Sequence, residues 1–323
     1  MAFSYKGGEF MQDIRAYRPR RSLRKLLYND WKRHKWKYIL VIPVILFFLL
    51  FHYKPMYGIL IAFKKYKPNR GIWGSDWVGL QYFYDFFTDY YFYRVVTNTF
   101  LISLYSLLWG FPMPILLALM LNELRSQWFK RTVQTVTYIP HFISLVVICG
   151  LIRQFSLSGG VFNDIIAFFG GTRTPLLQHP EYFRTIYVAS GIWQEVGWSS
   201  IIYLAALTGV DPQLYEAAEI DGAGRLRQTW HITLPGILPV IVMLLILQMG
   251  SILNVGYEKC LLLYNESTFA TADIIATYVY RKGLIDANFS YSTAVGLFNS
   301  IVNLLFLSAT NWISNRATGI GLF

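Results

Sequence analysis

Six long apolar stretches separated by polar segments dominate the pattern of the chain. They cover residues 36–57, 95–121, 132–152, 186–207, 236–257 and 289–312. A helix that crosses a hydrocarbon core needs about 20 apolar residues, because lipid offers no hydrogen-bond partner to an open backbone. The pattern therefore predicts an all-α integral membrane protein with six transmembrane helices.

Composition supports this interpretation and excludes several other classes. Of the 323 residues, 54% are hydrophobic and only 15% are charged, and the mean hydropathy is +0.38. Soluble proteins carry about 25% charged residues. The only two cysteines, Cys149 and Cys260, exclude a disulfide-dense secreted scaffold and a multi-cysteine zinc module.

The distribution of charge predicts the orientation in the membrane. Eleven basic residues accompany the start of the first stretch: Lys6, Arg15, Arg18, Arg20, Arg21, Arg24, Lys25, Lys32, Arg33, Lys35 and Lys37. By the positive-inside rule this end is cytoplasmic, and six crossings return the C-terminus to the same side. We interpret the basic run as a topology determinant rather than as an arm that binds nucleic acid or anionic lipid. It is too long for a cleavable signal peptide, so we expect the first stretch to stay as an anchor.

The chain divides into four parts on this model. They are a basic cytoplasmic tail (1–35), a first transmembrane helix with an aromatic outer loop (36–90), a five-helix core (91–316) and a cytoplasmic end (317–323). The outer segment 64–89 is rich in Tyr, Phe and Trp, which is typical of an interfacial belt or of short helices on the membrane surface.

The inner loop at 209–235 carries strong local signals. Asp211 followed by Pro212 predicts a helix start, and Gly222 with Gly224 predicts its end. We expect a second helix that stops at Leu234–Pro235, where the chain re-enters the bilayer. A helix, a glycine break and a helix at a fixed place suggest a docking element rather than an ordinary linker.

The complete string of this loop resembles that of binding-protein-dependent ABC importer permeases. Glu-Ala-Ala alone is only a good helix sequence. Here, however, Glu216, Ala217 and Ala218 are followed at fixed spacing by Gly222 and by Ile232-x-Leu234-Pro235. The resemblance extends over residues 36–316 and is strongest to importers of oligosaccharides derived from alginate or pectin. Further segments that carry it are 55–58, 77–80, 197–207, 253–258, 262–265, 277–281 and 294–298. Glu266 departs from the similar chains, which often place Pro there.

The resemblance implies a type I ABC importer permease fold and a set of coupling residues. In that family the loop sits in a groove of a separate ATPase. Glu216 would contact the ATPase, Gly222 would provide the bend and Pro235 would set re-entry. The coupling set is Glu216, Ala217, Ala218, Asp221, Gly222, Ile232, Leu234 and Pro235. The chain has no Gly-Lys pair and hence no phosphate loop, so ATP and Mg²⁺ are expected on partner subunits and no cofactor in this chain.

Candidates for the substrate path come from polar and aromatic residues within the spans. Glu195 is the only ionisable residue well inside one, and such residues face protein or water. The other candidates are Trp193, Gln194, Trp198, Gln248, Asn254 and Asn299, with Tyr203 and Asn303 beside them. Each has an alternative: hydrogen bonding between helices for the polar residues, and packing for the aromatic ones. We interpret His141 as a packed helix residue.

These observations favour a transport subunit rather than an enzyme. The sequence lacks H-E-x-x-H, G-x-S-x-G and any metal-ligand spacing. The partners that the resemblance implies are a second permease, two ABC ATPases and an extracytoplasmic solute-binding protein. We also expect contact with the lipid of a bacterial cytoplasmic membrane and no nucleic acid. The resemblance to alginate-type and pectin-type importers favours an acidic oligosaccharide as the substrate, with lipid-linked or neutral glycans as the alternatives. The alternative is an ion-coupled secondary sugar transporter, which would usually need more ionisable groups in the membrane than Glu195 alone.

Overall fold

The structure is a computed structural model that describes residues 23–322. It contains two compact units, residues 1–58 and 59–323. The described part of the first unit is one helical run, formed by α1 (Leu23–Phe48), the π-helical turn η1 (Leu49–Tyr53) and α2 (Lys54–Met56). None of its most apolar window is buried within the chain. This apolar surface therefore needs lipid or another protein around it.

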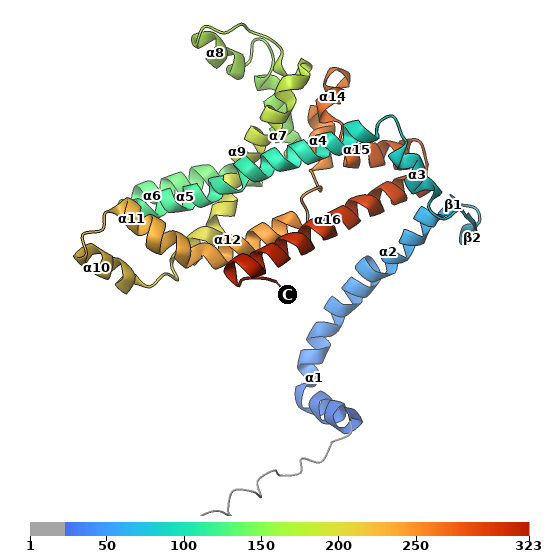
Figure 1. Ribbon diagram of the computed structural model, residues 1–323, viewed down its shortest axis with the longest axis horizontal. Helices are drawn as coiled ribbons and strands as arrows, with labels where there is room; N and C mark the ends of the chain where they lie inside the picture. Colours follow the sequence, from blue (N-terminus) through green and yellow to red (C-terminus); the bar gives the residue numbers. More distant parts are fainter. Residues whose placement is uncertain (1–22, 323) are drawn as a thin grey trace, which may run out of the picture. The chain divides into compact units, whose positions relative to one another are not determined.

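The second unit, together with the turn η2 that leads into it, holds the remaining elements (Figure 1). In chain order they are η2 (Tyr57–Phe63), β1 (Lys64–Lys67), β2 (Gly71–Trp77), α3 (Gln81–Phe87), α4 (Phe92–Tyr105), η3 (Ser106–Gly110), α5 (Pro112–Glu123), α6 (Gln127–Tyr138), η4 (Ile139–Phe142), α7 (Leu145–Phe155), α8 (Val161–Phe168), η5 (Leu176–Gln178), α9 (Pro180–Leu207), α10 (Pro212–Ile220), α11 (Arg225–Gln228), η6 (Thr229–Thr233), α12 (Leu234–Met249), α13 (Tyr257–Leu263), η7 (Glu266–Thr268), α14 (Phe269–Ala272), α15 (Ile275–Tyr280), η8 (Arg281–Ile285) and α16 (Phe289–Thr318).

Four helical runs in the described residues are long and apolar enough to cross a membrane: Trp31–Phe63, Phe92–Glu123, Arg225–Met249 and Phe289–Thr318. A fifth is added if the bent pair α6–α7 counts as one span. The predicted fourth span corresponds to α9, which is 28 residues long but carries Gln194 and Glu195 in its middle and is not among these candidates. The six-span count is therefore not confirmed by length and composition.

The apolar stretch 132–152, which was predicted as one transmembrane helix, is bent. The run 127–142 and α7 meet at an angle of 101°. Pro140 lies in the 3-10 turn η4, and Ile143 and Ser144 are extended. The Ser144 side chain then accepts a hydrogen bond from the Val147 N–H and starts α7 anew. Proline and a new N-cap thus outweigh the continuous apolar pattern.

The predicted fifth span also ends earlier than expected, at Met249 rather than at residue 257. The chain leaves the helix after Gly250 and is held by a side chain instead. The Leu253 N–H donates to Asn303 Oδ1 of α16 over 2.9 Å. The side-chain oxygen of Asn303 thus accepts the hydrogen bond that a backbone carbonyl would accept if the helix continued.

The aromatic segment 64–89 contains a β-hairpin that the sequence analysis did not predict. Strands β1 and β2 pair antiparallel, with Lys64 opposite Trp77. Gly71 adopts a φ of +64°, which favours glycine. Ser75 accepts a hydrogen bond from the Lys67 N–H and donates one to Gly71 O. The purely helical expectation needs this correction, although α3 is one of the short helices that were expected.

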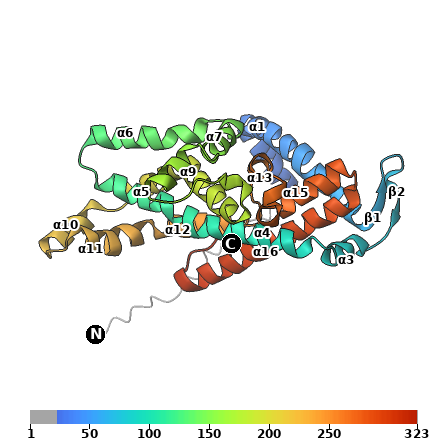
Figure 2. The ribbon, with the colours of Figure 1, turned by 90° about the horizontal axis from the view of Figure 1, so that it is seen from above.

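The helices of the second unit pack around α9, which contacts α5, α6 and α12, while α12 lies beside α16. One buried cluster, which includes Ile148, Phe183, Tyr187 and Cys260, joins α7, α9 and α13. Both views place α10 and α11 at one end of this unit, and α3 with the hairpin at the opposite end (Figures 1 and 2).

Candidate functional site

The loop at 209–235 begins and ends its first helix as its residues predict. The Asp211 carboxylate accepts a hydrogen bond of 2.9 Å from the Gln213 N–H, and Pro212 opens α10. At the other end Gly222 has a φ of +75°. Its N–H donates to Glu219 O, and the Ala223 N–H donates to Ala218 O at 2.8 Å. These two bonds form a Schellman motif, in which glycine takes the left-handed position without strain.

The second helix of the loop does not stop at Leu234–Pro235, so that prediction is wrong. α11 runs through the π turn η6 directly into α12. Proline lacks an N–H and crowds the carbonyl four residues before it. The wider π turn immediately before Pro235 accommodates it without a break.

Contacts within the loop hold its two helices together. Tyr215 Oη lies 3.0 Å from Thr233 Oγ1. Gln228 Nε2 donates to Ala223 O over 3.0 Å. At Gly236 an added Cβ would lie 2.9 Å from Val210 Cγ2, so the glycine lets α12 approach the start of the loop. The loop therefore has a defined tertiary structure and is not a flexible linker.

The predicted coupling residues lie mostly on the surface of this loop. Glu216, Ala217, Asp221, Gly222 and Pro235 are exposed, and Ala218, Ile232 and Leu234 are half-buried. Large apolar side chains project beside them, with Ile220 and Leu226 each 88% exposed. Apolar side chains gathered on a polar surface are typical of a site that contacts another protein.

A cavity of about 870 Å³ lies along α9. Of the predicted path residues, Gln194, Glu195, Trp198 and Gln248 line it, and so does Tyr203. The sequence analysis missed other polar lining residues: Ser106, Tyr187, Ser199, Ser251 and Lys259. No signal in the sequence singled out Lys259, because Glu258 directly precedes it and apolar residues follow it only over 260–263.

Three predicted path residues lie elsewhere. Trp193 lines a separate, mostly apolar cavity of about 930 Å³ between α7, α8 and α9. Asn254 lines a small cavity of about 200 Å³, which shares Tyr187 and Gln248 with the large one. Asn254 Oδ1 accepts hydrogen bonds of 3.0 Å from both Asn299 and Asn303. This amide cluster supports the alternative of hydrogen bonding between segments.

Glu195 is held by His141, which the sequence analysis interpreted only as a packed helix residue. His141 Nδ1 lies 2.9 Å from Glu195 Oε2. The imidazole stacks on Trp198 with ring centroids 4.5 Å apart. His141 belongs to η4, at the bend between α6 and α7. The pair therefore ties this bend to α9 at the cavity wall.

Lys259 provides the second charge of the cavity wall. The residue is only 7% exposed, and its Nζ donates to Tyr187 O over 3.0 Å. The ammonium also lies 4.7 Å from the centre of the Tyr187 ring. Burial lowers the pKa of Lys259 to about 8. Among the residues that line this cavity, only Glu195 and Lys259 are charged.

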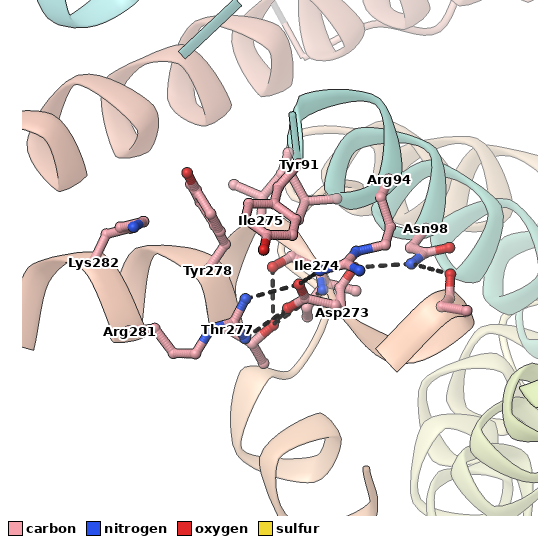
Figure 3. A network of polar contacts seen from close by, with 12 residues as sticks. Tyr91, Arg94, Asn98, Asp273, Ile274, Ile275, Thr277, Tyr278, Arg281 and Lys282 are labelled. Atoms are coloured by element: carbon pink, nitrogen blue, oxygen red, sulfur yellow. Dashed lines mark hydrogen bonds and ion pairs between the residues drawn. The ribbon is translucent and has the colours of Figure 1, made fainter. Parts of the chain in front are cut away.

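A buried ionic network around Asp273 joins α4 to the chain around α14 and α15 (Figure 3). Both carboxylate oxygens of Asp273 accept 2.7 Å bonds from Arg281. Arg94 Nη2 and Thr277 Oγ1 add contacts of 3.2 and 2.9 Å. Arg184 of α9 joins through Asn98, which donates to Asp273 O. The sequence pattern did not predict these contacts, because the residues are far apart in the chain. In the described part of the chain, no group of three metal-ligating side chains occurs.

A family model for the inner membrane component of binding-protein-dependent transport systems matches residues 110–319. This range includes the loop and every residue that lines the cavity except Ser106. The chain belongs to this family. It is 48% identical to the polygalacturonan/rhamnogalacturonan transport system permease protein YteP of Bacillus subtilis over 93% of this chain and 94% of the relative. It is 46% identical to protein LplB of the same organism, over 90% and 92%.

Solved structures of the family give the same result. A chain from a crystal structure of a bacterial ABC transporter involved in the import of the acidic polysaccharide alginate is 45% identical, with a TM-score of 0.83 over 91% of this chain and 99% of that one. A second match, at 44% identity and a TM-score of 0.84, comes from such a transporter in complex with an alginate pentasaccharide-bound periplasmic protein. Membership of a transport family agrees with the expectation of a transport subunit rather than an enzyme.

Proposed function

We propose that this protein is a permease subunit of an ATP-driven importer of acidic oligosaccharides in the bacterial cytoplasmic membrane. The observation that carries the proposal is the structure of the loop 211–235. Its two helices are separated by glycines and have exposed apolar side chains that a partner could cover. ATP hydrolysis on that partner would move the loop, and the loop is covalently continuous with α12 beside the cavity. Motion at the loop would thereby change access to the cavity.

The proposed assembly contains a second permease, two ATPase subunits that bind ATP and Mg²⁺, and an extracytoplasmic solute-binding protein. The exposed apolar surface of helices such as α1 and α16 supports contact with lipid and with a second permease. The ATPase would contact Glu216 and its neighbours on α10. The chain itself would perform no chemistry.

The nature of the relatives and of the cavity supports an acidic oligosaccharide as the substrate. Polygalacturonan, rhamnogalacturonan and alginate appear in the names of relatives above 40% identity. The cavity offers Trp198 and Tyr203 for stacking on sugar rings, and Gln194 and Gln248 for hydroxyl groups. Oligogalacturonides are accordingly the substrates of choice for a test.

Six crossings with both termini inside remain our proposal for the topology. α9 would provide one span despite Glu195, since that carboxylate lines the cavity and is paired with His141. α6–α7 would provide a bent span. Single cysteines at Ser4 and Thr318, in a variant with Cys149 and Cys260 replaced by Ser, should react with an impermeant thiol reagent only after the cells are opened. Labelling of either site in intact cells would overturn the proposed topology.

The function is tested by reconstitution of the whole complex in proteoliposomes. We expect uptake of labelled oligogalacturonides to require ATP, the ATPase subunits and the loaded binding protein, with no ion gradient imposed. An imposed proton or sodium gradient that drives accumulation without ATP would instead establish the ion-coupled alternative.

A further inference from the structure

One buried cation on the cavity wall lacks an acidic partner. Lys259 Nζ donates to the backbone oxygen of Tyr187. Within the described residues, no carboxylate oxygen lies within 4.0 Å of this Nζ, whereas Arg94 and Arg281 nearby both contact Asp273. An ammonium has three donors. Lys259 therefore keeps hydrogen-bonding capacity for a ligand.

The surroundings of Lys259 keep its ammonium at the cavity. Gly191 lies one helical turn beyond Tyr187 on α9, and both residues line the cavity with Lys259. A Cβ at Gly191 would lie 3.3 Å from Lys259 Nζ. That contact is tighter than most side-chain contacts, so the glycine provides room for the ammonium. The helix α9 thus accommodates a charge that most helix faces would exclude.

The two charges of the wall lie at neighbouring turns of α9. Gly191, where an added Cβ would lie 3.3 Å from Lys259 Nζ, precedes Glu195 by four positions, which corresponds to about 6 Å along the helix axis. Glu195 is paired with His141, and its negative charge favours the charged form of Lys259 without an ion pair between the two. Lys259 is therefore the one positive charge among the residues that line this cavity.

We propose that Lys259 is a specificity-determining residue that binds the carboxylate of a uronate sugar as the oligosaccharide passes through the cavity. This inference rests on the proposed function. A partly desolvated ammonium gains more from a carboxylate than from a neutral hydroxyl, because charge-assisted hydrogen bonds are the stronger ones and water screens them less there. Acidic chains would be favoured over neutral chains of the same shape.

The inference makes a prediction on pH dependence that a purely structural lysine would not share. The groups that face Lys259 are the Cys149 thiol of α7, the neighbouring Cys260 thiol, and Tyr187 and Glu195 of α9. Because burial lowers the Lys259 pKa to about 8, the charge should be lost as the pH rises through that value. Lys259→Arg keeps its charge throughout. We therefore expect uptake of the acidic oligosaccharide by the wild type, divided by its uptake by Lys259→Arg, to decrease as the pH is raised from 7 to 9.

The decisive experiment compares two substrates in the reconstituted complex. One is an oligogalacturonide, and the other is the same chain with its carboxyl groups reduced to alcohols, each at saturating binding protein as verified by titration. For Lys259→Met we expect the ratio of acidic to reduced uptake to fall about tenfold, the loss expected for one charge-assisted hydrogen bond. Lys259→Arg should retain at least half of the wild-type ratio. Lys282→Met, which removes an outer lysine paired with Asp286 at 3.1 Å, is the matched control and should leave ratio and basal ATPase activity unchanged.

The outcomes separate this inference from the proposed function. An unchanged ratio in Lys259→Met, or an equal loss of both substrates, would overturn the role of Lys259 while ATP-dependent uptake by the wild type still stood. Absence of ATP-dependent uptake in the wild type would overturn the proposed function itself. If Lys259→Met does not assemble with the ATPase, Lys259→Gln replaces it, since its amide can donate to Tyr187 O without carrying charge.

Discussion

The inner loop and the cavity differ in how their geometry is determined. The hydrogen bonds between residues of the loop join positions at most 18 apart, such as Tyr215 and Thr233. The cavity wall combines residues from Ser106 to Lys259, and its charged groups depend on partners 54 and 72 positions away. A change in the loop should therefore alter coupling while the fold persists. A change at the cavity should alter packing or substrate preference.

Replacement of Gly222 by Pro should have the largest effect, a nearly complete loss of ATP-driven uptake. Proline fixes φ near −65° and has no N–H, whereas Gly222 has a φ of +75° and donates to Glu219 O. The α10 end would be rebuilt, and the ATPase would lose its contact surface. Uptake and substrate-stimulated ATPase activity should both fall, with the amount of permease in the membrane unchanged.

Gly224→Ala is the matched control for the Gly222 variant. Gly224 has a φ of −68° and open space where a Cβ would be. The Gly224→Ala variant should therefore transport substrate at the wild-type rate. Normal ATPase stimulation and transport by Gly222→Pro would remove the loop from the mechanism.

Gly197→Ala should have the next largest effect, on stability rather than on coupling. At this position on α9 an added Cβ would meet the backbone carbonyl of Thr137 on α6. Overpacking of this kind costs roughly 1–3 kcal/mol. We expect a lower midpoint of thermal unfolding in detergent. Gly296→Ala on α16, where nothing lies within 4 Å of the added atom, should leave the midpoint unchanged or raise it, and equal midpoints for both variants would contradict the close α6–α9 contact.

The comparison also explains what could be predicted from the sequence. Asp211, Pro212 and Gly222 obey local rules of helix starts and ends, so the first half of the loop was predicted correctly. The π turn before Pro235 and the bend at Pro140 were not predicted. The pattern of apolar residues indicates which surfaces lipid or protein covers, but it does not indicate the backbone hydrogen-bonding pattern within a helix. Glu195 was predicted as a candidate because burial of a charge within a membrane span costs free energy. Its contact with His141, and that of Lys259 with Tyr187, arise only from tertiary packing.

Asp211→Ala should have a smaller effect, confined to the loop. Loss of an N-cap side chain costs about 1 kcal/mol of helix stability. The 2.9 Å bond to the Gln213 N–H would disappear, while Pro212 would still favour the helix start. We expect uptake to fall a few-fold at most, with an unchanged unfolding midpoint of the whole permease. Asp211→Asn or Asp211→Ser should restore uptake, and failure of both to do so would point to a role for the charge itself.

Glu195→Gln should have the smallest effect, and it separates the importer from its ion-coupled alternative. The amide oxygen of Gln can still accept a bond from His141 Nδ1, now 2.9 Å from the carboxylate. The Glu195 side chain is 48% exposed, and such exposed pairs contribute about 0–1 kcal/mol. Uptake in proteoliposomes should therefore fall about fivefold at most and should stay strictly dependent on ATP. A carrier driven by protons or sodium would behave differently, because its single carboxylate in the membrane would bind the coupling ion. Accumulation driven by an ion gradient alone, and abolished in Glu195→Gln, would show that the carboxylate and not the loop carries the coupling.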